Sequence, residues 1–251
     1  MNTHLRNLIL IFLSFTNPIQ AQSNPKTPAS TQEKASILVF THTKGHRHVS
    51  IKKGVSTLRE LSEKEGMIIT HTEDPLKFNP ENLSKYQLVV FLSATGDVLE
   101  SAQEQAFQSY IQNGGSFMGI HAATDAEYNW PWYGKLVGAY FESHPEQQTA
   151  RVEVINQNHP ATKDLEVPWI HFDEWYNFKD IREGITVLMM LDESSYEGGK
   201  NGSYHPIAWY HEFDGGRSFY TGLGHTEEAF DSPNFRKHLL GGMHYCLGLR
   251  Q

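Results

Sequence analysis

The stretch that decides the fold reads Ser36-Ile37-Leu38-Val39-Phe40 and is followed directly by Thr41-His42-Thr43-Lys44-Gly45-His46-Arg47-His48. An unbroken apolar run such as 37–40 is typical of a strand covered on both faces, as in parallel sheets. The residues before it, 22–34, are polar and rich in Pro, Ser and Thr, so we expect a flexible linker there. Ordered structure is therefore predicted to begin near residue 35.

Apolar runs of this kind recur along the chain, and helical patterns lie between them. Further strands are expected at 67–70, 88–92, 116–120 and 218–221. Residues 50–64 and 100–113 carry apolar side chains at helical spacing, and Asn113-Gly114-Gly115 is a helix stop signal. This alternation predicts an α/β domain with a doubly wound, mostly parallel sheet and right-handed crossovers.

The second half of the chain has shorter β-like pieces and loops. Such pieces are expected at 150–154, 186–190 and 207–210. The sequence Asp214-Gly215-Gly216-Arg217 predicts a hairpin turn, and a helix is expected from Pro233 to Leu247. The sequence shows no internal repeat and no second core after a linker, so we predict one domain over 35–251.

Residues 1–21 have the pattern of a cleaved signal peptide. A short region with Arg6 precedes the apolar stretch 8–15, which is too short to span a bilayer, and small or polar residues lead to Ala21. The alternatives are a disordered tail or an uncleaved anchor. We expect a periplasmic or secreted protein without a stable membrane span.

Composition narrows the class of protein. The chain has 251 residues, of which 39% are hydrophobic, and this is enough for one sizeable core. The formal net charge is −8 and no basic run is present, so nucleic acid is not expected as a partner. Cys246 is the only cysteine, which excludes an internal disulfide and suits a small buried side chain.

Polar and titratable residues follow directly after four of the predicted strands. These segments are 41–48, 93–97, 121–125 and 222–228. In open α/β sheets the ligand crevice lies outside the carboxyl ends of the strands. The four segments are therefore predicted to converge in one site, although they are far apart in sequence.

His121 follows a strand at a turn of small residues, Gly119-Ile120-His121-Ala122-Ala123, which should open a helix. A Ser or Cys at this place would form a nucleophile elbow. A His makes an acyl-enzyme improbable, but it can serve as metal ligand, general base or proton donor. Asp125 would lie one helical turn further on and face the same way. The alternative is a helix-cap residue bonded to backbone.

A metal site is one interpretation of the histidines in 42–48, since His46 and His48 would share a face of an extended segment. The chain has no HExxH motif, no pair of Cys ligands and no Asp-rich calcium loop. Surface histidines are the alternative, and spacing alone does not decide between them.

Two segments mix carboxylates with aromatic rings, as sugar sites do. The first, 170–178, contains Asp173 and Glu174, and it could equally be an edge strand with a charged outer face and an aromatic inner face. The second, 127–133, contains two Trp residues that could simply be packing.

Several motifs, taken as an ordered set from Ile37 to Gly248, resemble the ThuA-like family associated with trehalose utilisation. They are Val39-Phe40-Thr41 with Arg47-His48, Leu92-Ser93-Ala94-Thr95-Gly96-Asp97-Val98-Leu99, Gly119-Ile120-His121-Ala122-Ala123-Thr124-Asp125, Trp130-Pro131-Trp132-Tyr133-Gly134, Phe141-Glu142-Ser143-His144-Pro145, Asp173-Glu174-Trp175-Tyr176-Asn177, His205-Pro206-Ile207-Ala208-Trp209 and Tyr220-Thr221-Gly222-Leu223-Gly224-His225-Thr226.

The resemblance implies a flavodoxin-like sheet similar to that of class I glutamine amidotransferases, without their chemistry, because His121 replaces the elbow Cys. It also implies a role in processing disaccharides or oxidised keto-sugars. No nucleotide cofactor is expected, and a divalent metal stays open. A non-catalytic sugar-binding protein and a disabled amidotransferase-like scaffold are the rival hypotheses. The sequence does not give the oligomeric state.

The candidate site residues fall into three groups. The catalytic candidates are His121, Asp125, Glu174 and His225. The candidates for substrate binding are Thr41, Asp97, Trp132 and Tyr176. The candidates for metal binding are His48, His121 and His144.

Overall fold

A mixed sheet of nine strands runs through the protein in the order β2-β1-β3-β4-β11-β10-β9-β6-β7. The computed structural model describes Met1 and residues 34–249, and a second, two-stranded sheet in this part pairs β5 with β8. The strands are β1 (Ser36–Phe40), β2 (Ile68–Thr72), β3 (Leu88–Leu92), β4 (Ser116–Ile120), β5 (Tyr140–Ser143), β6 (Gln148–Val154), β7 (Trp169–Asp173), β8 (Asn177–Lys179), β9 (Thr186–Asp192), β10 (Pro206–Phe213) and β11 (Gly216–Thr221).

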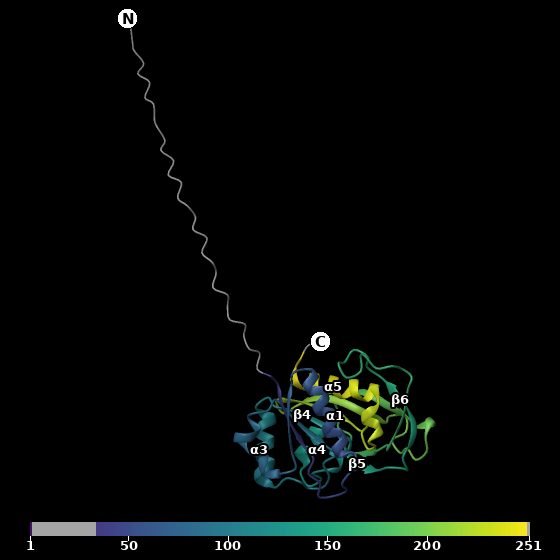
Figure 1. The fold of residues 1–251 in the computed structure, drawn as a ribbon. Helices are drawn as coiled ribbons and strands as arrows, with labels where there is room; N and C mark the ends of the chain where they lie inside the picture. Colours follow the sequence, from purple (N-terminus) through teal and green to yellow (C-terminus); the bar gives the residue numbers. More distant parts are fainter. Residues whose placement is uncertain (2–33, 250–251) are drawn as a thin grey trace. The chain divides into compact units, whose positions relative to one another are not determined.

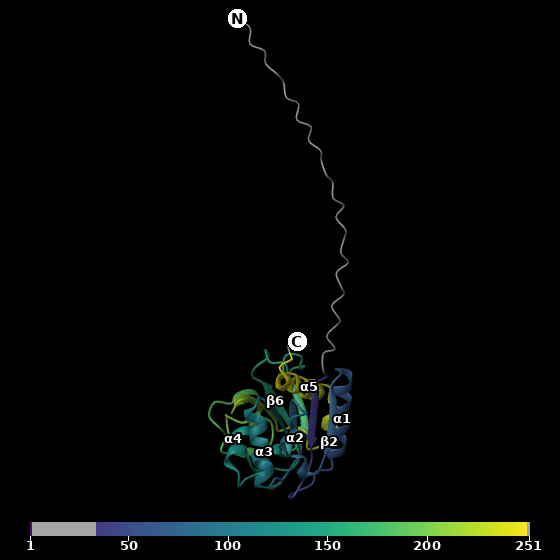
Figure 2. The same cartoon turned by 90° about the vertical axis from the view of Figure 1, so that its left-hand side faces the viewer.

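The first five strands of the sheet, β2 to β11 in sheet order, are parallel. Every residue of β3 and β4 is buried, as the apolar runs in the sequence predict. Figure 2 shows α2, α3 and α4 on the side of the sheet opposite α1. The helices are α1 (Ile51–Lys64), α2 (Pro80–Leu83), α3 (Ser101–Gln112), α4 (Pro131–Val137) and α5 (Pro233–Leu247). The predicted α/β class is confirmed.

Local sequence signals explain where the long helices begin and end. The side chain of Gln103 accepts the backbone N–H of Glu100 at 2.7 Å, which caps the start of α3. In α5 the hydroxyl of Ser232 accepts the N–H of Phe235, Pro233 occupies the first turn, and Gly248 ends the helix at φ +68°. Figure 1 shows α5 beside α1, and the two helices are in contact.

The other four strands are antiparallel to their neighbours, so β9 and β7 run in the same direction as β11. The carboxyl end of β7 therefore points to the same edge of the sheet as the ends of β4 and β11. In a flat sheet β7 would lie about 19 Å from β11, four strand spacings of about 4.8 Å. Yet Asp173, the last residue of β7, accepts hydrogen bonds from residues 224–226, so the sheet curves until these segments meet.

The side chains on the two faces of β7 are not arranged as in the edge strand that the sequence analysis considered for 170–178. An edge strand is found, but Ile170 and Phe172 are the exposed residues, while His171 and Asp173 are buried. The prediction of a charged outer face and an aromatic inner face is therefore wrong for this strand. The carboxylate is turned inward because backbone N–H groups of the loop after β11 surround it.

The core contains Cys246, which is 2% exposed and whose thiol donates to the carbonyl of Phe117 at 3.3 Å. None of the helices in the described residues has the length and apolar character needed to cross a bilayer. Apart from Met1 and Lys34, the predicted signal peptide, residues 1–21, and the predicted linker, 22–34, lie outside the described residues, and so both remain predictions.

Candidate functional site

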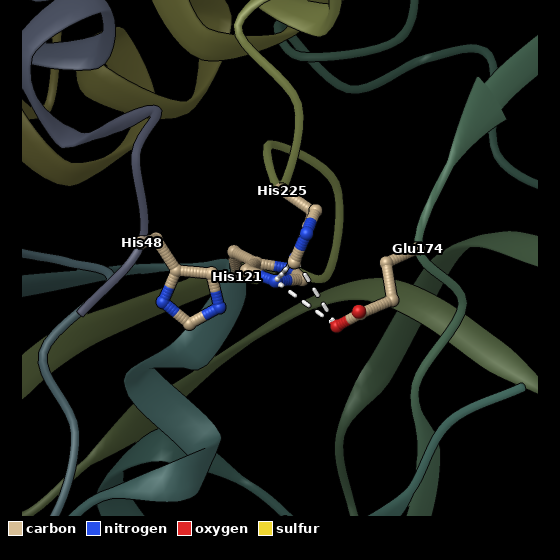
Figure 3. Close-up of side chains that lie close together, drawn as sticks. All are labelled: His48, His121, Glu174 and His225. Carbon is tan, nitrogen blue, oxygen red and sulfur yellow. Dashed lines mark hydrogen bonds and ion pairs between the residues drawn. The ribbon is translucent and has the colours of Figure 1, made fainter. Parts of the chain in front are cut away.

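Four side chains meet at the carboxyl edge of the sheet. His48 comes from the loop after β1, His121 follows β4, Glu174 follows β7 and His225 lies in the loop after β11. Figure 3 shows them pointing toward one another. One potential donor atom from each lies within 4.8 Å of the donor atoms of the other three. Three of these residues follow strands whose polar ends the sequence analysis predicts to converge, and Glu174 follows β7.

Three of the donor atoms are closer still. His121 Nε2 lies 3.1 Å from His225 Nδ1, and Glu174 Oε2 lies 3.2 Å from His225 Nδ1 and 3.6 Å from His121 Nε2. The His48 ring stands edge-on to both imidazoles, with ring centroids 4.8 Å from His121 and 5.0 Å from His225. The site is therefore a compact cluster of three imidazoles and one carboxylate.

The turn at His121 directs its ring into the cluster. The residue has φ +51°, a left-handed conformation that is uncommon for a side chain with a Cβ. A 3₁₀ helix, His121–Asp125, follows it in place of the expected α-helix. Its Nδ1 lies 2.9 Å from the carbonyl oxygen of Gly222, and since a carbonyl only accepts, Nδ1 carries the proton. Nε2 is therefore the ring nitrogen that faces the cluster.

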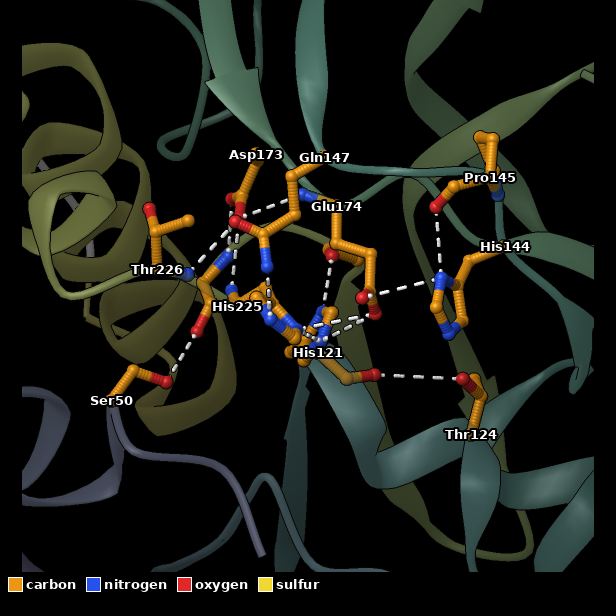
Figure 4. A network of polar contacts seen from close by, with 12 residues as sticks. Ser50, His121, Thr124, His144, Pro145, Gln147, Asp173, Glu174, His225 and Thr226 are labelled. Atoms are coloured by element: carbon orange, nitrogen blue, oxygen red, sulfur yellow. Dashed lines mark hydrogen bonds and ion pairs between the residues drawn. The ribbon is translucent and has the colours of Figure 1, made fainter. Parts of the chain in front are cut away.

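Asp173 holds the loop that carries His225 (Figure 4). Its buried carboxylate accepts the backbone N–H of Gly224 at 2.7 Å, of His225 at 3.0 Å and of Thr226 at 3.2 Å. Gly224 has φ +112°, a backbone conformation that favours glycine. The two neighbouring carboxylates thus have different roles, since Asp173 fixes the backbone of the loop and Glu174 contacts the His225 ring.

Burial and neighbouring groups set the protonation of the cluster. Burial acts to raise the pKa of Glu174, but hydrogen bonds and charges from His121 and His225 together outweigh it and hold that pKa well below its usual range. Burial, reinforced by the rings of His121 and His225, holds the pKa of His48 far below its usual value. Near neutral pH the cluster therefore contains an ionised carboxylate and a neutral His48.

More exposed side chains surround the cluster. His144 Nδ1 lies 3.3 Å from Glu174 Oε1, and Gln147 Nε2 lies 2.9 Å from His225 Nε2. Asp125 accepts a hydrogen bond from the Tyr128 hydroxyl at 2.8 Å. Burial raises the pKa of Asp125, and the hydrogen bond from Tyr128 opposes that rise. These groups form the rim from which a polar ligand could be bound.

Tyr176 packs directly on the cluster. Its ring centroid lies 4.4 Å from that of His121 and 4.3 Å from that of Phe141. Its backbone carbonyl accepts from Nε2 of buried His205 at 2.8 Å, which fixes the segment after Glu174. Within the described residues its hydroxyl has no hydrogen-bond partner, so it is available to a ligand.

Three candidate residues have other contacts. The hydroxyl of buried Thr41 lies 2.7 Å from His71 Nε2, toward β2. The indole of Trp132 donates to Asp214 at 2.8 Å, at the turn between β10 and β11, and stacks on Trp130. Asp97 accepts from Asn129 at 2.6 Å. None of these contacts involves the four cluster residues, so their assignment to substrate binding remains a prediction.

Asp173, Gln147 and the carbonyl of Gly222 contact the cluster residues but are absent from the candidates. The sequence did contain a signal for Asp173 as a site residue, because it precedes Glu174 in a segment already singled out for its carboxylates. Gly222 lies in the segment 222–228 that is predicted to reach the site, but no signal marks its carbonyl, and none marks Gln147, because both contacts are tertiary.

Two cavities lie away from the cluster, toward the other edge of the sheet. One, of about 480 Å³, lies between α2 and α3 and is lined by Leu83, Tyr86 and Tyr110 among others. The second, of about 490 Å³, borders the β10–β11 turn. Neither is lined by a histidine, so the chemistry of the cluster has no counterpart in them.

Comparisons with known proteins place this chain in a family. A family model described as ThuA, trehalose utilisation, matches residues 36–246. A ThuA-like protein from Bacteroides uniformis is 24% identical, with a TM-score of 0.72 over 88% of this chain and 95% of its own. A ThuA-like protein from Parabacteroides merdae is 21% identical, also with a TM-score of 0.72, over 86% and 91%. Among curated proteins, none matches the sequence.

A likeness in fold extends to larger proteins. A β-galactosidase from Bacillus circulans is 12% identical, with a TM-score of 0.54 over 86% of this chain but only 31% of its own. At this identity the likeness concerns the fold alone.

Proposed function

Because the chain belongs to the ThuA family of trehalose utilisation, we propose that it is an exported enzyme that processes a disaccharide or keto-sugar by acid–base chemistry. The family indicates carbohydrate metabolism. Export is supported by the signal-peptide pattern of residues 1–21. The catalytic part of the proposal is supported by the cluster of His121, Glu174 and His225.

The observation that carries the proposal is the contact of an ionised carboxylate with two imidazoles at 3.2 and 3.6 Å. General acid–base catalysis needs a proton acceptor and a proton donor held close to the reacting atoms. Glu174 and His121 are 5% and 0% exposed, while the His225 side chain is 15% exposed. His225 is therefore the member best placed to exchange a proton with a substrate, and Glu174 Oε2 lies 3.2 Å from its Nδ1.

A keto-sugar suits such a pair because its carbonyl group acidifies the neighbouring C–H bond. Removal of that proton by one group, with expulsion of the glycosidic oxygen that the other group protonates, would cleave the sugar and leave a C=C bond beside the carbonyl. Around the cluster, Asp125, His144, Gln147 and the free hydroxyl of Tyr176 offer the hydrogen-bonding groups that sugar hydroxyls need. No nucleotide is required for this chemistry.

The test is turnover of trehalose and of 3-keto-disaccharides by the wild-type protein and by His121→Ala. We expect product with at least one of these sugars and a loss of at least about 100-fold in kcat/KM for the variant. Glu63→Gln, an exposed change on α1, serves as the matched control and should keep full activity. Sugar binding without turnover, preserved in His121→Ala, would instead identify a non-catalytic sugar-binding protein.

We also propose that the parallel half of the sheet is flavodoxin-like and doubly wound. The strand order β2-β1-β3-β4-β11, with helices on both faces, supports this description.

A further inference from the structure

The spacing of the donor atoms in the cluster matches the coordination shell of a metal ion. Metal bonds of about 2.1 Å at tetrahedral or octahedral angles place neighbouring ligand atoms about 3.0 to 3.4 Å apart. The three atoms His121 Nε2, His225 Nδ1 and Glu174 Oε2 are separated by 3.1, 3.2 and 3.6 Å. Two nitrogen atoms and one oxygen atom therefore already surround a point at which a small cation would fit.

His48 supplies the second, independent observation. It is 5% exposed, yet neither of its ring nitrogens has a hydrogen-bond partner among the described residues. Its Nδ1 is buried away from water, and a buried ring nitrogen without a partner is costly. Figure 3 shows this ring turned toward His121, so a metal ion in the cluster would give one of its nitrogens a partner.

The remaining atoms of the other three residues are held from outside, as in known metal sites (Figure 4). His121 donates through Nδ1 to the carbonyl of Gly222 at 2.9 Å, which directs the Nε2 lone pair inward. His225 Nε2 faces the amide of Gln147 at 2.9 Å, and Glu174 Oε1 faces His144 at 3.3 Å. Outer contacts of this kind orient a ligand without occupying the atom that binds the metal.

The charge of the cluster also favours a cation. Within the described part of the chain, the ion-pair partners of Glu174 are His121, His144 and His225, and no Lys or Arg lies among them. Its buried carboxylate therefore has no permanently charged neighbour. A divalent ion bound by three neutral imidazoles and one carboxylate would balance that charge and leave one positive charge in the site.

We propose that His48, His121, Glu174 and His225 bind one divalent first-row transition-metal ion. Imidazole-rich sets with one carboxylate suit zinc, iron(II), cobalt(II) or nickel(II), whereas magnesium and calcium prefer oxygen ligands alone. His144 lies outside the ligand set, and its contact with the four residues is to the far oxygen of Glu174 at 3.3 Å. This proposal goes beyond the sugar chemistry and does not depend on it.

The experiment titrates the full chain, produced with a tag free of histidine and stripped with EDTA, with Co²⁺. Visible absorption reports cobalt coordination, and elemental analysis gives the metal content of the protein as purified. We expect one Co²⁺ per chain and at least about 100-fold weaker binding for His48→Ala and His225→Ala. His46→Ala is the matched control, because this exposed ring lies 4.7 Å from that of His48 but outside the cluster. It should bind within about threefold of wild type.

Two results would overturn the proposal. One is the absence of saturable Co²⁺ binding by wild-type protein that circular dichroism shows to be folded. The other is a folded His48→Ala variant that binds as tightly as wild type. Stoichiometric metal without sugar turnover would leave the site standing and remove the proposed function. Sugar turnover together with no saturable Co²⁺ binding would do the reverse.

Discussion

Gln147 faces the outer nitrogen of His225, and its amide has two orientations that serve different protonation states. With its NH₂ group toward His225 Nε2, as drawn, the proton of His225 lies on Nδ1, inside the cluster. A metal ion on Nδ1 would move that proton to Nε2, where the amide oxygen of Gln147 can accept it after a flip. The side chain is therefore suited to support either state.

The matching prediction concerns metal affinity. Gln147→Leu cannot accept from His225 Nε2 and should weaken Co²⁺ binding about 10- to 100-fold, as removal of such outer partners does in other sites. Gln147→Glu keeps an acceptor and should bind at least as tightly as wild type. Glu146→Leu, at the neighbouring exposed position, is the control for local disturbance. Equal affinities for the Leu and Glu variants of Gln147 would contradict this role.

Glu127 should make stability depend on pH. It is 1% exposed, and its carboxylate accepts the N–H groups of Val98 and Leu99 at 2.9 and 2.8 Å. Burial nevertheless raises its pKa from 4.5 to about 7. Because the folded state then holds the proton more tightly than the unfolded state, this stabilisation is complete below about pH 4.5 and is lost as pH rises through about 7.

Glu127→Gln removes the charge and keeps an acceptor oxygen. The free energy of unfolding of the variant minus that of wild type should therefore be about 1 to 3 kcal/mol larger at pH 8 than at pH 4.5, so that the variant gains stability relative to wild type at the higher pH. Urea unfolding at both pH values measures the difference. Glu63→Gln, on the exposed face of α1, should show no such change with pH. A pH-independent difference for Glu127→Gln would show that burial does not perturb this carboxyl.

A polar residue directly after a strand can be placed at the edge of the sheet from the sequence, but the direction in which its side chain points cannot. His121 and His225 were predicted to converge because their strands end at one edge, and they lie 3.1 Å apart. Thr41 follows β1 of the same sheet, but its hydroxyl points to His71. Which way a side chain turns depends on neighbours from other elements, and the sequence of its own segment does not contain them.

Among the elements, the loop after β11 is the part on which the cluster depends most. Gly224 has φ +112°, and an added Cβ would lie 3.2 to 3.4 Å from Phe230, Phe235 and Ile120. Gly224→Ala should therefore destabilise the protein by about 1 to 3 kcal/mol and displace His225.

The matched control for this loop is Gly184→Ala. Gly184 also has a positive φ, +84°, but an added Cβ there meets nothing within 4 Å. Both variants should lower the unfolding temperature, whereas only Gly224→Ala should weaken Co²⁺ binding, by at least about tenfold. If both or neither variant changed the affinity, the loop would have no special role in placing His225.

The sequence predicts the central elements closely and the outer half of the sheet poorly. The strands at 36–40, 88–92 and 116–120 and the helix at 233–247 have the predicted bounds, because apolar runs and cap residues mark them. The curvature that brings β7 to the loop after β11 has no local signal. It results from contacts such as those of Asp173 with residues 224–226, which lie about fifty residues further along the chain.

On the scale of the whole molecule, a metal ion in the cluster would join segments that span residues 48 to 225. Such an ion binds only the folded chain, so it should stabilise the fold by about 2.7 kcal/mol at a concentration 100 times its Kd. For a domain of this size, that corresponds to a rise in unfolding temperature of about 5 to 10 °C.

Differential scanning calorimetry with and without Co²⁺ measures this rise. EDTA should reverse it, and His46→Ala should retain it because that ring lies outside the cluster. His48→Ala should show no rise at the same Co²⁺ concentration. A similar rise in His48→Ala would place the bound ion elsewhere on the protein.

Cys246 gives the chain a built-in reporter of its own opening. It is the only thiol, it is 2% exposed between α5 and β4, and burial raises its pKa. Burial shields it from thiol reagents in the folded chain, so departure of α5 from the sheet should speed labelling in native buffer. Because no cysteine has to be introduced, the rate of Cys246 labelling can be measured for wild type and for every variant described above.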